Sequence, residues 1–301
     1  MNAHLGAHLR PEPAIGRIEL SVLWAAVYAS LFRSPVPRHA LRARLCGVSA
    51  SESEIDRALN RPLLRGMIET TAAELWLRTD DLAERQLAFR IRRGLTQDLM
   101  LRHAPIFPFL RGLPGVRLAA LSGGCAHEAA DDGDIDVFLV TQEGYLWRTL
   151  LHSLLVSKAR GWRRVLCLNY AVDTSALRLP GSDYYSAFEL ISLRPFAGAS
   201  ALSDLWNANG WAREVFPNFV PDGVRGQNAA QPEKPSARPH LLEATARMIH
   251  RPYLRRRLPR SAGVELSANA VRLHSTDHRP VVTRRFREAL GELGLEAPPW
   301  I

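Results

Sequence analysis

Apolar residues recur at helical spacing near the start of the chain. Residues 18–32 carry apolar side chains three and four positions apart and run into a Ser-Pro-Val-Pro stop, which predicts a helix and its end. A second helix is expected over residues 38–46. A third helix is predicted to begin with a capping sequence at residues 49–52 and to stop at Gly66.

The pattern then changes to short extended runs. Residues 67–70 and 75–77 are separated by a turn of small residues, which predicts a hairpin. Three helices followed by a hairpin are the outline of a winged helix, and we expect a winged-helix-like domain over residues 17–79. Residues 1–16 show no such pattern and are expected to be a disordered N-terminus.

An arginine-rich helix is predicted next, and we expect residues 80–104 to bridge the first domain to the second. Its apolar residues suggest which face of the helix is buried. The expected inner stripe consists of Leu82, Leu87, Ile91, Leu95 and Leu99.

The middle of the chain alternates between extended and helical patterns. The predicted elements are strands at 117–121, 135–140 and 164–172, a loop or short helix at 125–130, and helices at 145–160 and 182–194. Strands that alternate with helices over short links are typical of an α/β sheet layer. We therefore predict one α/β core over residues 105–200.

The last third of the chain is expected to be mostly helical, over residues 201–301. Helices are predicted at residues 240–258 and 279–293. Between them, residues 221–239 are rich in Pro, Gly, Gln, Asn and Ala and have no apolar periodicity, which predicts a flexible loop.

Composition limits the class of protein. The chain has 301 residues, of which 47% are hydrophobic, and this is enough for two or three packed units. No apolar stretch reaches the roughly 18–20 residues of a membrane span, and the start has no signal-peptide core, so we expect a cytoplasmic protein without a membrane partner. The three cysteines are widely spaced, which predicts neither a disulfide framework nor a zinc site.

The net charge of +9 would suit a polyanion, either nucleic acid or a nucleotide. Nearly all of this charge is arginine, since Lys158 and Lys234 are the only lysines. An arginine excess of this kind also fits a bias of composition. Nucleic acid is therefore possible as a partner but is not favoured.

The chemistry is concentrated between residues 121 and 140. Asp134 and Asp136 are one residue apart at the start of a predicted strand, so their side chains point to the same face. Two carboxylates on one face can hold a divalent metal ion. The glycines Gly123 and Gly124 come just before, where backbone amides can approach a phosphate without obstruction by a side chain. A metal site beside a phosphate cradle indicates phosphoryl chemistry.

The order of these features resembles the nucleotidyltransferase superfamily typified by DNA polymerase beta. Its signature is a glycine pair or Gly-Ser after a strand, about ten residues, and then Asp, an apolar residue and Asp on the next strand. Here Gly123-Gly124 is followed by nine residues and by Asp134-Ile135-Asp136. Three further segments, at residues 167–170, 185–190 and 194–195, are similar to bacterial nucleotidyltransferase-domain proteins that carry an N-terminal winged helix.

This resemblance implies an α+β fold, with a nucleotidyltransferase core of a small mixed sheet and flanking helices between the winged-helix-like domain and the helical C-terminal region. It implies an enzyme that transfers a nucleoside monophosphate from an NTP, expected to be ATP, to an unknown acceptor and releases pyrophosphate. Asp134 and Asp136 would hold Mg²⁺ or Mn²⁺. Ser122, Gly123 and Gly124 would bind the triphosphate.

Active members of the family usually place a third carboxylate on a later neighbouring strand. This chain has Asn169 at the corresponding position. Asp173, just past that strand, and Glu189, on the following helix, are the candidates for the missing acid, and we include Glu189 with Asp134 and Asp136 as catalytic. A structural role for Glu189, paired with an arginine such as Arg194, is the alternative.

Two other functions remain open. The substitution of Asn169 for an acid fits a catalytically degenerate nucleotidyltransferase fold that acts as a nucleotide sensor or interaction module. The predicted winged helix fits a DNA-binding regulator that reads DNA through Arg57, Arg61 and Arg65.

Overall fold

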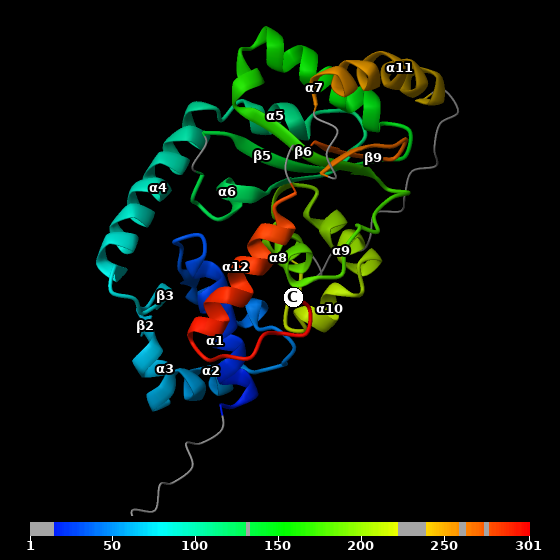
Figure 1. Ribbon diagram of the computed structural model, residues 1–301. Coiled ribbons are helices and arrows are strands. Elements are labelled where there is room, and N and C mark those ends of the chain that lie inside the picture. The colour runs from blue at the N-terminus through cyan, green and yellow to red at the C-terminus, as the bar shows by residue number, and fades with distance from the viewer. Residues whose placement is uncertain (1–14, 131–132, 222–238, 259–262, 274–276) are drawn as a thin grey trace, which may run out of the picture.

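The computed structural model describes residues 15–130, 133–221, 239–258, 263–273 and 277–301. The fold is mixed α/β, with helices flanking two sheets (Figure 1). Most of the predicted disordered N-terminus and of the predicted loop at 221–239 lies outside the described residues. In the part of the chain that is described, no helix has an apolar stretch long enough to cross a bilayer.

The N-terminal helices differ from the prediction in two places. Helix α1 (Arg17–Ser30) forms as expected. The predicted third helix is two helices, α2 (Glu52–Leu59) and α3 (Pro62–Met67), because Pro62 starts a new helix at its first position. The predicted second helix is instead a pair of 3₁₀ turns, Arg38–Ala40 and Arg42–Arg44.

A small antiparallel sheet follows these helices. The predicted hairpin is confirmed as β2 (Ile68–Thr70) and β3 (Glu74–Leu77), with Ile68 opposite Leu77. A third strand, β1 (Val36–Pro37), pairs with β3 and gives the order β1-β3-β2. The two prolines around Val36 indicated only a helix stop, yet this residue is buried and paired.

The predicted inner stripe of the bridging helix is wrong at three of its five positions, since Leu99 is buried and Leu82 is partly buried. In α4 (Leu82–Arg102) the side chains of Leu87, Ile91 and Leu95 are 53%, 56% and 57% exposed. The buried side chains are Arg85, Phe89, Thr96 and Leu99. Two of these are polar and hydrogen-bonded, since Arg85 Nη2 donates to the Ser30 carbonyl at 2.7 Å and Thr96 Oγ1 accepts from the Ala130 amide at 3.0 Å. The buried face therefore combines two apolar side chains, Phe89 and Leu99, with two polar ones that bond to neighbouring elements.

The large sheet is built around the three predicted strands. These are β4 (Val116–Leu121), β5 (Ile135–Thr141) and β6 (Leu166–Asp173). Strands β7 (Arg194–Ala197), β8 (Val264–Leu266) and β9 (Ala270–Leu273) extend it in the order β7-β4-β5-β6-β9-β8. Among the described strands of this sheet, β5 and β6 form the one parallel pair. The C-terminal region therefore contributes strands as well as helices.

Helices cover both faces of this sheet (Figure 1). One face packs against α5 (Ile106–Arg111), α7 (Leu146–Ala159) and α11 (Pro239–Arg257). The other face shares a core with α8 (Tyr184–Ser192), α9 (Ala199–Ala208), α10 (Ala212–Val215) and α12 (Arg279–Glu292), of which α9 contacts β4 while α10 and α12 contact α8. Along β5, Val137 belongs to the first core and Phe138 to the second, as period-two alternation requires.

The second core continues into the N-terminal helices through a group of aromatic rings. Tyr28 of α1 lies 4.9 Å from Tyr184, 4.6 Å from Phe188 and 5.1 Å from Phe286, measured between ring centroids. Two hydrogen bonds to the C-terminal segment lie beside these rings. Trp24 Nε1 donates to the Glu296 carbonyl at 2.7 Å, and the Tyr184 amide donates to the Trp300 carbonyl at 2.9 Å. The first and last helices are thus parts of one core.

Replacing Phe286 by Ala tests this shared core. The ring is fully buried, so its loss leaves a cavity that close-packed neighbours fill only in part. We expect the free energy of unfolding to fall by about 3–5 kcal/mol in urea denaturation followed by circular dichroism. Val281→Ala on the same helix is the control, since Val281 is 44% exposed, and should change stability by less than about 0.5 kcal/mol. Equal effects of the two substitutions would contradict the packing described.

Candidate active site

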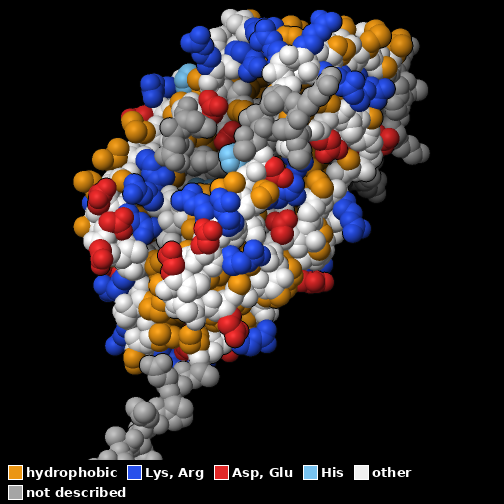
Figure 2. Space-filling view, in the orientation of Figure 1, with side chains coloured by type: hydrophobic (Ala, Val, Ile, Leu, Met, Phe, Trp, Pro, Cys, Tyr) orange, Lys and Arg blue, Asp and Glu red, His pale blue; other side chains and the backbone are white. Residues whose placement is uncertain are grey.

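A cavity of about 840 Å³ lies where the N-terminal helices, α8 and one edge of the large sheet meet. Figure 2 shows a hollow near the middle of this face with arginine or lysine side chains beside it. All six residues selected from the sequence line the cavity: Ser122, Gly123, Gly124, Asp134, Asp136 and Glu189. Residues that are up to 67 positions apart in sequence (189 − 122) are therefore brought to one place.

The two aspartates are positioned by the start of β5. Ile135 and Val137 are fully buried, whereas Asp134 and Asp136 are partly exposed and line the cavity, as the period of a strand predicts. Two hydrogen bonds from the residues that flank the glycine turn, Gly123-Gly124, hold the backbone of both aspartates. The Ser122 amide donates to the Asp136 carbonyl at 3.0 Å, and Cys125 Sγ donates to the Asp134 carbonyl at 3.2 Å.

The glycine turn opens the short helix α6 (Gly123–Ala126) and lies against the Asp136 carboxylate. Gly123 has a φ of +54°, and a Cβ there would stand 2.5 Å from Asp136 Oδ2. A Cβ on Gly124 would stand 2.8 Å from the Ala130 Cα. Both positions exclude a side chain because other atoms occupy that space. The Ser122 side chain forms no hydrogen bond to the helix that it precedes.

Asn169 occupies the neighbouring strand at the level of the aspartates. Its Nδ2 donates to Asp136 Oδ1, and its Oδ1 accepts from Cys167 Sγ at 2.7 Å. The thiol thereby fixes which end of the amide faces the carboxylate. The position at which the family resemblance implies an acid thus holds an amide in direct contact with Asp136.

Asp173 is not part of the site. It lies at the other end of β6, where its partner on β5 is Thr141, and its side chain is almost fully buried. The carboxylate accepts from the Ser175 amide at 2.9 Å and from the Ser175 hydroxyl at 2.6 Å. It therefore orders the turn after β6 and is removed from the candidates for a third acid.

Glu189 lies on α8 and lines the cavity together with Asp134 and Asp136. Burial, reinforced by the negative charge of Asp136, raises the pKa of Glu189 to about 7. The alternative pairing with Arg194 is wrong, because Arg194 Nη1 bonds to Glu128 Oε1 at 3.0 Å. A carboxyl group that titrates near neutrality can accept a proton from a substrate at physiological pH.

The donor set fits a magnesium ion that is shared with a ligand. Within the described residues, no three His, Cys, Asp or Glu side chains lie close enough together to enclose a metal ion by themselves. Magnesium needs no such cage, since it usually takes one or two carboxylates together with substrate phosphates and water. Asp134 and Asp136 supply two carboxylates of this kind beside the glycine turn.

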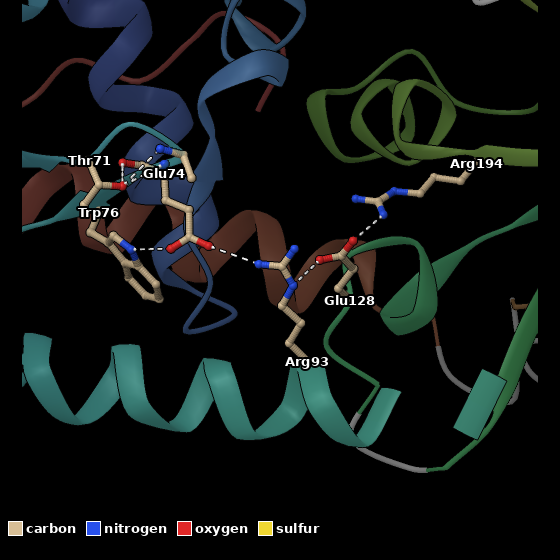
Figure 3. A network of polar contacts seen from close by, with 7 residues as sticks. Thr71, Glu74, Trp76, Arg93, Glu128 and Arg194 are labelled. Atoms are coloured by element: carbon tan, nitrogen blue, oxygen red, sulfur yellow. Dashed lines mark hydrogen bonds and ion pairs between the residues drawn. The ribbon is translucent and has the colours of Figure 1, made fainter. Parts of the chain in front are cut away.

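Arginines gather on the wall beside the glycine turn, and Figure 3 shows how they are held. Arg93 Nε of α4 lies 2.8 Å from Glu128 Oε2, and Arg194 of β7 lies 3.0 Å from the other oxygen of the same carboxylate. Arg93 also pairs with Glu74 of β3 at 3.6 Å. Glu128 adopts a left-handed φ of +55°, unusual for a residue with a side chain, directly after α6.

His127 lies on the same wall and is uncharged near pH 7. Burial, followed by the positive charges of Arg44 and Arg194, lowers the pKa of His127 to about 3. Its ring stacks on Phe188 of α8 with 5.6 Å between centroids. Sequence patterns gave no sign of this wall. Its members come from the N-terminal unit (α1–α3, the two 3₁₀ turns and the β1-β3-β2 sheet), from α4, from the residues after α6 and from β7, which only the tertiary fold brings together.

The raised pKa of Glu189 predicts a specific dependence of stability on pH. The unfolded chain releases this proton near pH 4.5 and the folded protein only near pH 7, so the stabilisation present below pH 4.5 is lost as the pH rises to about 7. Glu189→Gln removes this loss. The variant should be more stable than the unsubstituted protein by about 1–3 kcal/mol above pH 7, and the two should converge below pH 4.5.

Urea titrations at intervals from pH 4.5 to pH 8.5 measure this difference. Glu292→Gln is the matched control, since Glu292 is an exposed carboxylate at the end of α12. Its stability should follow that of the unsubstituted protein at every pH. A stability difference for Glu189→Gln that stays constant over this range would show that the carboxyl group is not perturbed.

Comparisons of the chain with protein-family models, with curated proteins and with solved structures found no match. The function is therefore argued from the cavity and the residues around it.

Proposed function

We propose that this protein is a magnesium-dependent nucleotidyltransferase, which transfers a nucleoside monophosphate from an NTP to an acceptor and releases pyrophosphate. The observation that carries the proposal is the contact between the glycine turn and Asp136, with Asp134 beside it at the edge of one cavity. A phosphate bound at the turn would lie next to the carboxylates that a metal ion requires.

The arrangement of elements supports the same proposal. The turn lies between β4 and β5, the aspartates open β5, and β6 lies beside them with Asn169 at the same level. This is the order expected for a nucleotidyltransferase core. The helices α1, α2 and α3 with the β1-β3-β2 sheet likewise support a winged-helix-like unit before it.

The residues present have definite roles in this reaction. Mg²⁺ or Mn²⁺ held by Asp134 and Asp136 would neutralise the phosphates of the nucleotide. Glu189 would accept the proton of an acceptor hydroxyl as its oxygen bonds to the α-phosphorus and the bond to the pyrophosphate oxygen breaks. The arginine wall beside the turn would balance the charge of the phosphate chain. ATP is the nucleotide to test first.

Asp136→Asn should abolish transfer while leaving the shape of the cavity unchanged. We expect label transfer from α-³²P-labelled ATP to cell-extract acceptors to fall by at least about 100-fold, since the charge that holds the metal ion is lost. Asp98→Asn, an exposed aspartate on α4 outside the cavity, should retain the activity. The proposal fails if the unsubstituted protein neither binds NTP with Mg²⁺ or Mn²⁺ nor transfers label.

A catalytically silent nucleotide sensor is the second candidate, and the contact of Asn169 with Asp136 is the observation that favours it. An amide there supplies one negative charge less than a third acid would, which weakens the hold on a metal ion. In this case the nucleotide would bind and stabilise the fold without turnover. Asp136→Asn would then leave the cellular function intact.

Asn169→Asp separates the contribution of this amide from the rest of the site. We expect the affinity for Mn²⁺, measured from the shift of the melting temperature with metal concentration, to rise by about tenfold or more. Without metal the variant should melt lower than the unsubstituted protein, because two carboxylates then meet at Asp136. Unchanged affinity for Mn²⁺ would place the metal ion away from this strand.

The arginines expected to read DNA have structural partners inside the N-terminal unit. Arg61 pairs with Glu19 at 2.9 Å, Arg65 bonds to Asn60 at 2.7 Å, and Arg57 bonds to the Ser53 carbonyl at 3.3 Å. These contacts give each arginine a local role. Duplex DNA is accordingly not part of the proposal.

A further inference from the structure

Arg44 brings a positive charge from the N-terminal unit into the cavity. It ends the second 3₁₀ turn, Arg42–Arg44, and lines the cavity together with the glycine turn. Its guanidinium carbon lies 5.1 Å from the centre of the Phe188 ring. His127 stacks on that same ring, and the His127 amide donates to the Gly124 carbonyl at 3.2 Å. A short series of contacts therefore connects Arg44 to the turn.

In the part of the chain that the structure describes, no carboxylate pairs with Arg44. Among the described residues, its side chain forms neither a hydrogen bond nor an ion pair with a carboxylate. The neighbouring groups that could carry a negative charge are Tyr28 and Tyr184, and burial raises the pKa of each well above the usual range, so both are neutral at pH 7. Burial and the nearby Arg194 lower the pKa of Arg44 to about 10, which still leaves it charged.

This distinguishes Arg44 from the other arginines of the wall. Arg93 and Arg194 share the carboxylate of Glu128. A partly buried guanidinium with only an aromatic ring beneath it is costly, because the interior does not replace its hydration. Its planar fork of donors matches two oxygens of a phosphate. The missing partner is then an anion that enters the cavity.

We infer that Arg44 binds a phosphoryl group of the ligand in this cavity, at the end of the phosphate chain away from the carboxylates. The inference rests on the proposed function, which supplies a polyphosphate as that ligand. Its consequence concerns the N-terminal unit, which becomes one wall of the nucleotide site. The same chemistry could come from a phosphorylated acceptor, and the experiment separates the two sources.

The test measures the binding of tripolyphosphate by isothermal titration calorimetry, without metal ions, to the full chain. Arg44→Met removes the charge and keeps an apolar side chain over Phe188, and we expect its affinity to be about 10- to 100-fold weaker. Arg44→Lys keeps the charge but not the planar fork of donors, so its affinity for tripolyphosphate should lie between those of the unsubstituted protein and Arg44→Met. Arg57→Gln, which removes an exposed arginine outside the cavity, should bind as the unsubstituted protein does.

A second pair of titrations identifies the source of the phosphate. If it belongs to the nucleotide, Arg44→Met weakens the binding of ATP with Mg²⁺ and leaves that of AMP nearly unchanged. If it belongs to an acceptor, the substitution leaves ATP unchanged and weakens the binding of inorganic phosphate to protein saturated with a non-hydrolysable ATP analogue. We expect the first result, and either one supports a phosphoryl site at Arg44.

If Arg44→Met binds tripolyphosphate, ATP and phosphate with unchanged affinity, the inference is overturned. If the melting temperature of Arg44→Met is also lowered in that case, Arg44 is a packing residue. If Arg44→Met does not fold, Arg44→Lys decides by the same titrations. The two proposals fail separately. If Arg44→Met still transfers the nucleotide and binds ATP with unchanged affinity, only the proposal of a phosphoryl site at Arg44 is rejected. If the protein binds tripolyphosphate through Arg44 but binds no nucleotide, only the proposal of nucleotidyl transfer is rejected.

Discussion

The close approach of α6 to the first residues of β5 determines the rest of the site. Because Gly123 has no side chain, the turn can lie against the Asp136 carboxylate, and because Gly124 has none, the chain can fold back over it toward Ala130. That return path sets the positions of His127 and Glu128, and through them the arginine wall. Any side chain at either glycine would push the turn away and separate the acidic and basic halves of the cavity.

The second constraint is that the walls of the cavity share one core. Tyr28 of the N-terminal unit packs directly on Phe188. The Phe188 ring also contacts the guanidinium of Arg44 and stacks with the ring of His127. The next residue, Glu189, reaches the cavity from the same helix. Apolar packing thus holds in place both Glu189, whose pKa is raised, and Arg44, which has no carboxylate partner among the described residues. Each costs stability in the empty protein, and a site that binds a metal ion and phosphates would relieve both.

The parts of the site that could be predicted from the sequence are those that depend on neighbouring residues. The alternation of a strand places Asp134 and Asp136 together, and spacing alone brings the glycine turn to them. The prediction for α4 is wrong at Leu87 and Ile91, which satisfy a helical period but are exposed, because the buried face also contains Arg85, held by a hydrogen bond to another helix. Arg44 could not be predicted, since its place depends on the packing of separate units. The strands β7, β8 and β9 were missed because each has only three or four residues.

The bond from Trp24 to the Glu296 carbonyl has a consequence for how the protein is made, because it joins positions 272 residues apart. Helix α1 is synthesised early, yet the aromatic rings that cover it belong to α8 and α12. Helix α2 and strand β3 cover part of its apolar surface early, but the part around Tyr28 stays uncovered on the ribosome until α12 has emerged. The cavity, whose walls come from both sides of this packing, is complete only once α1 has met α8 and α12.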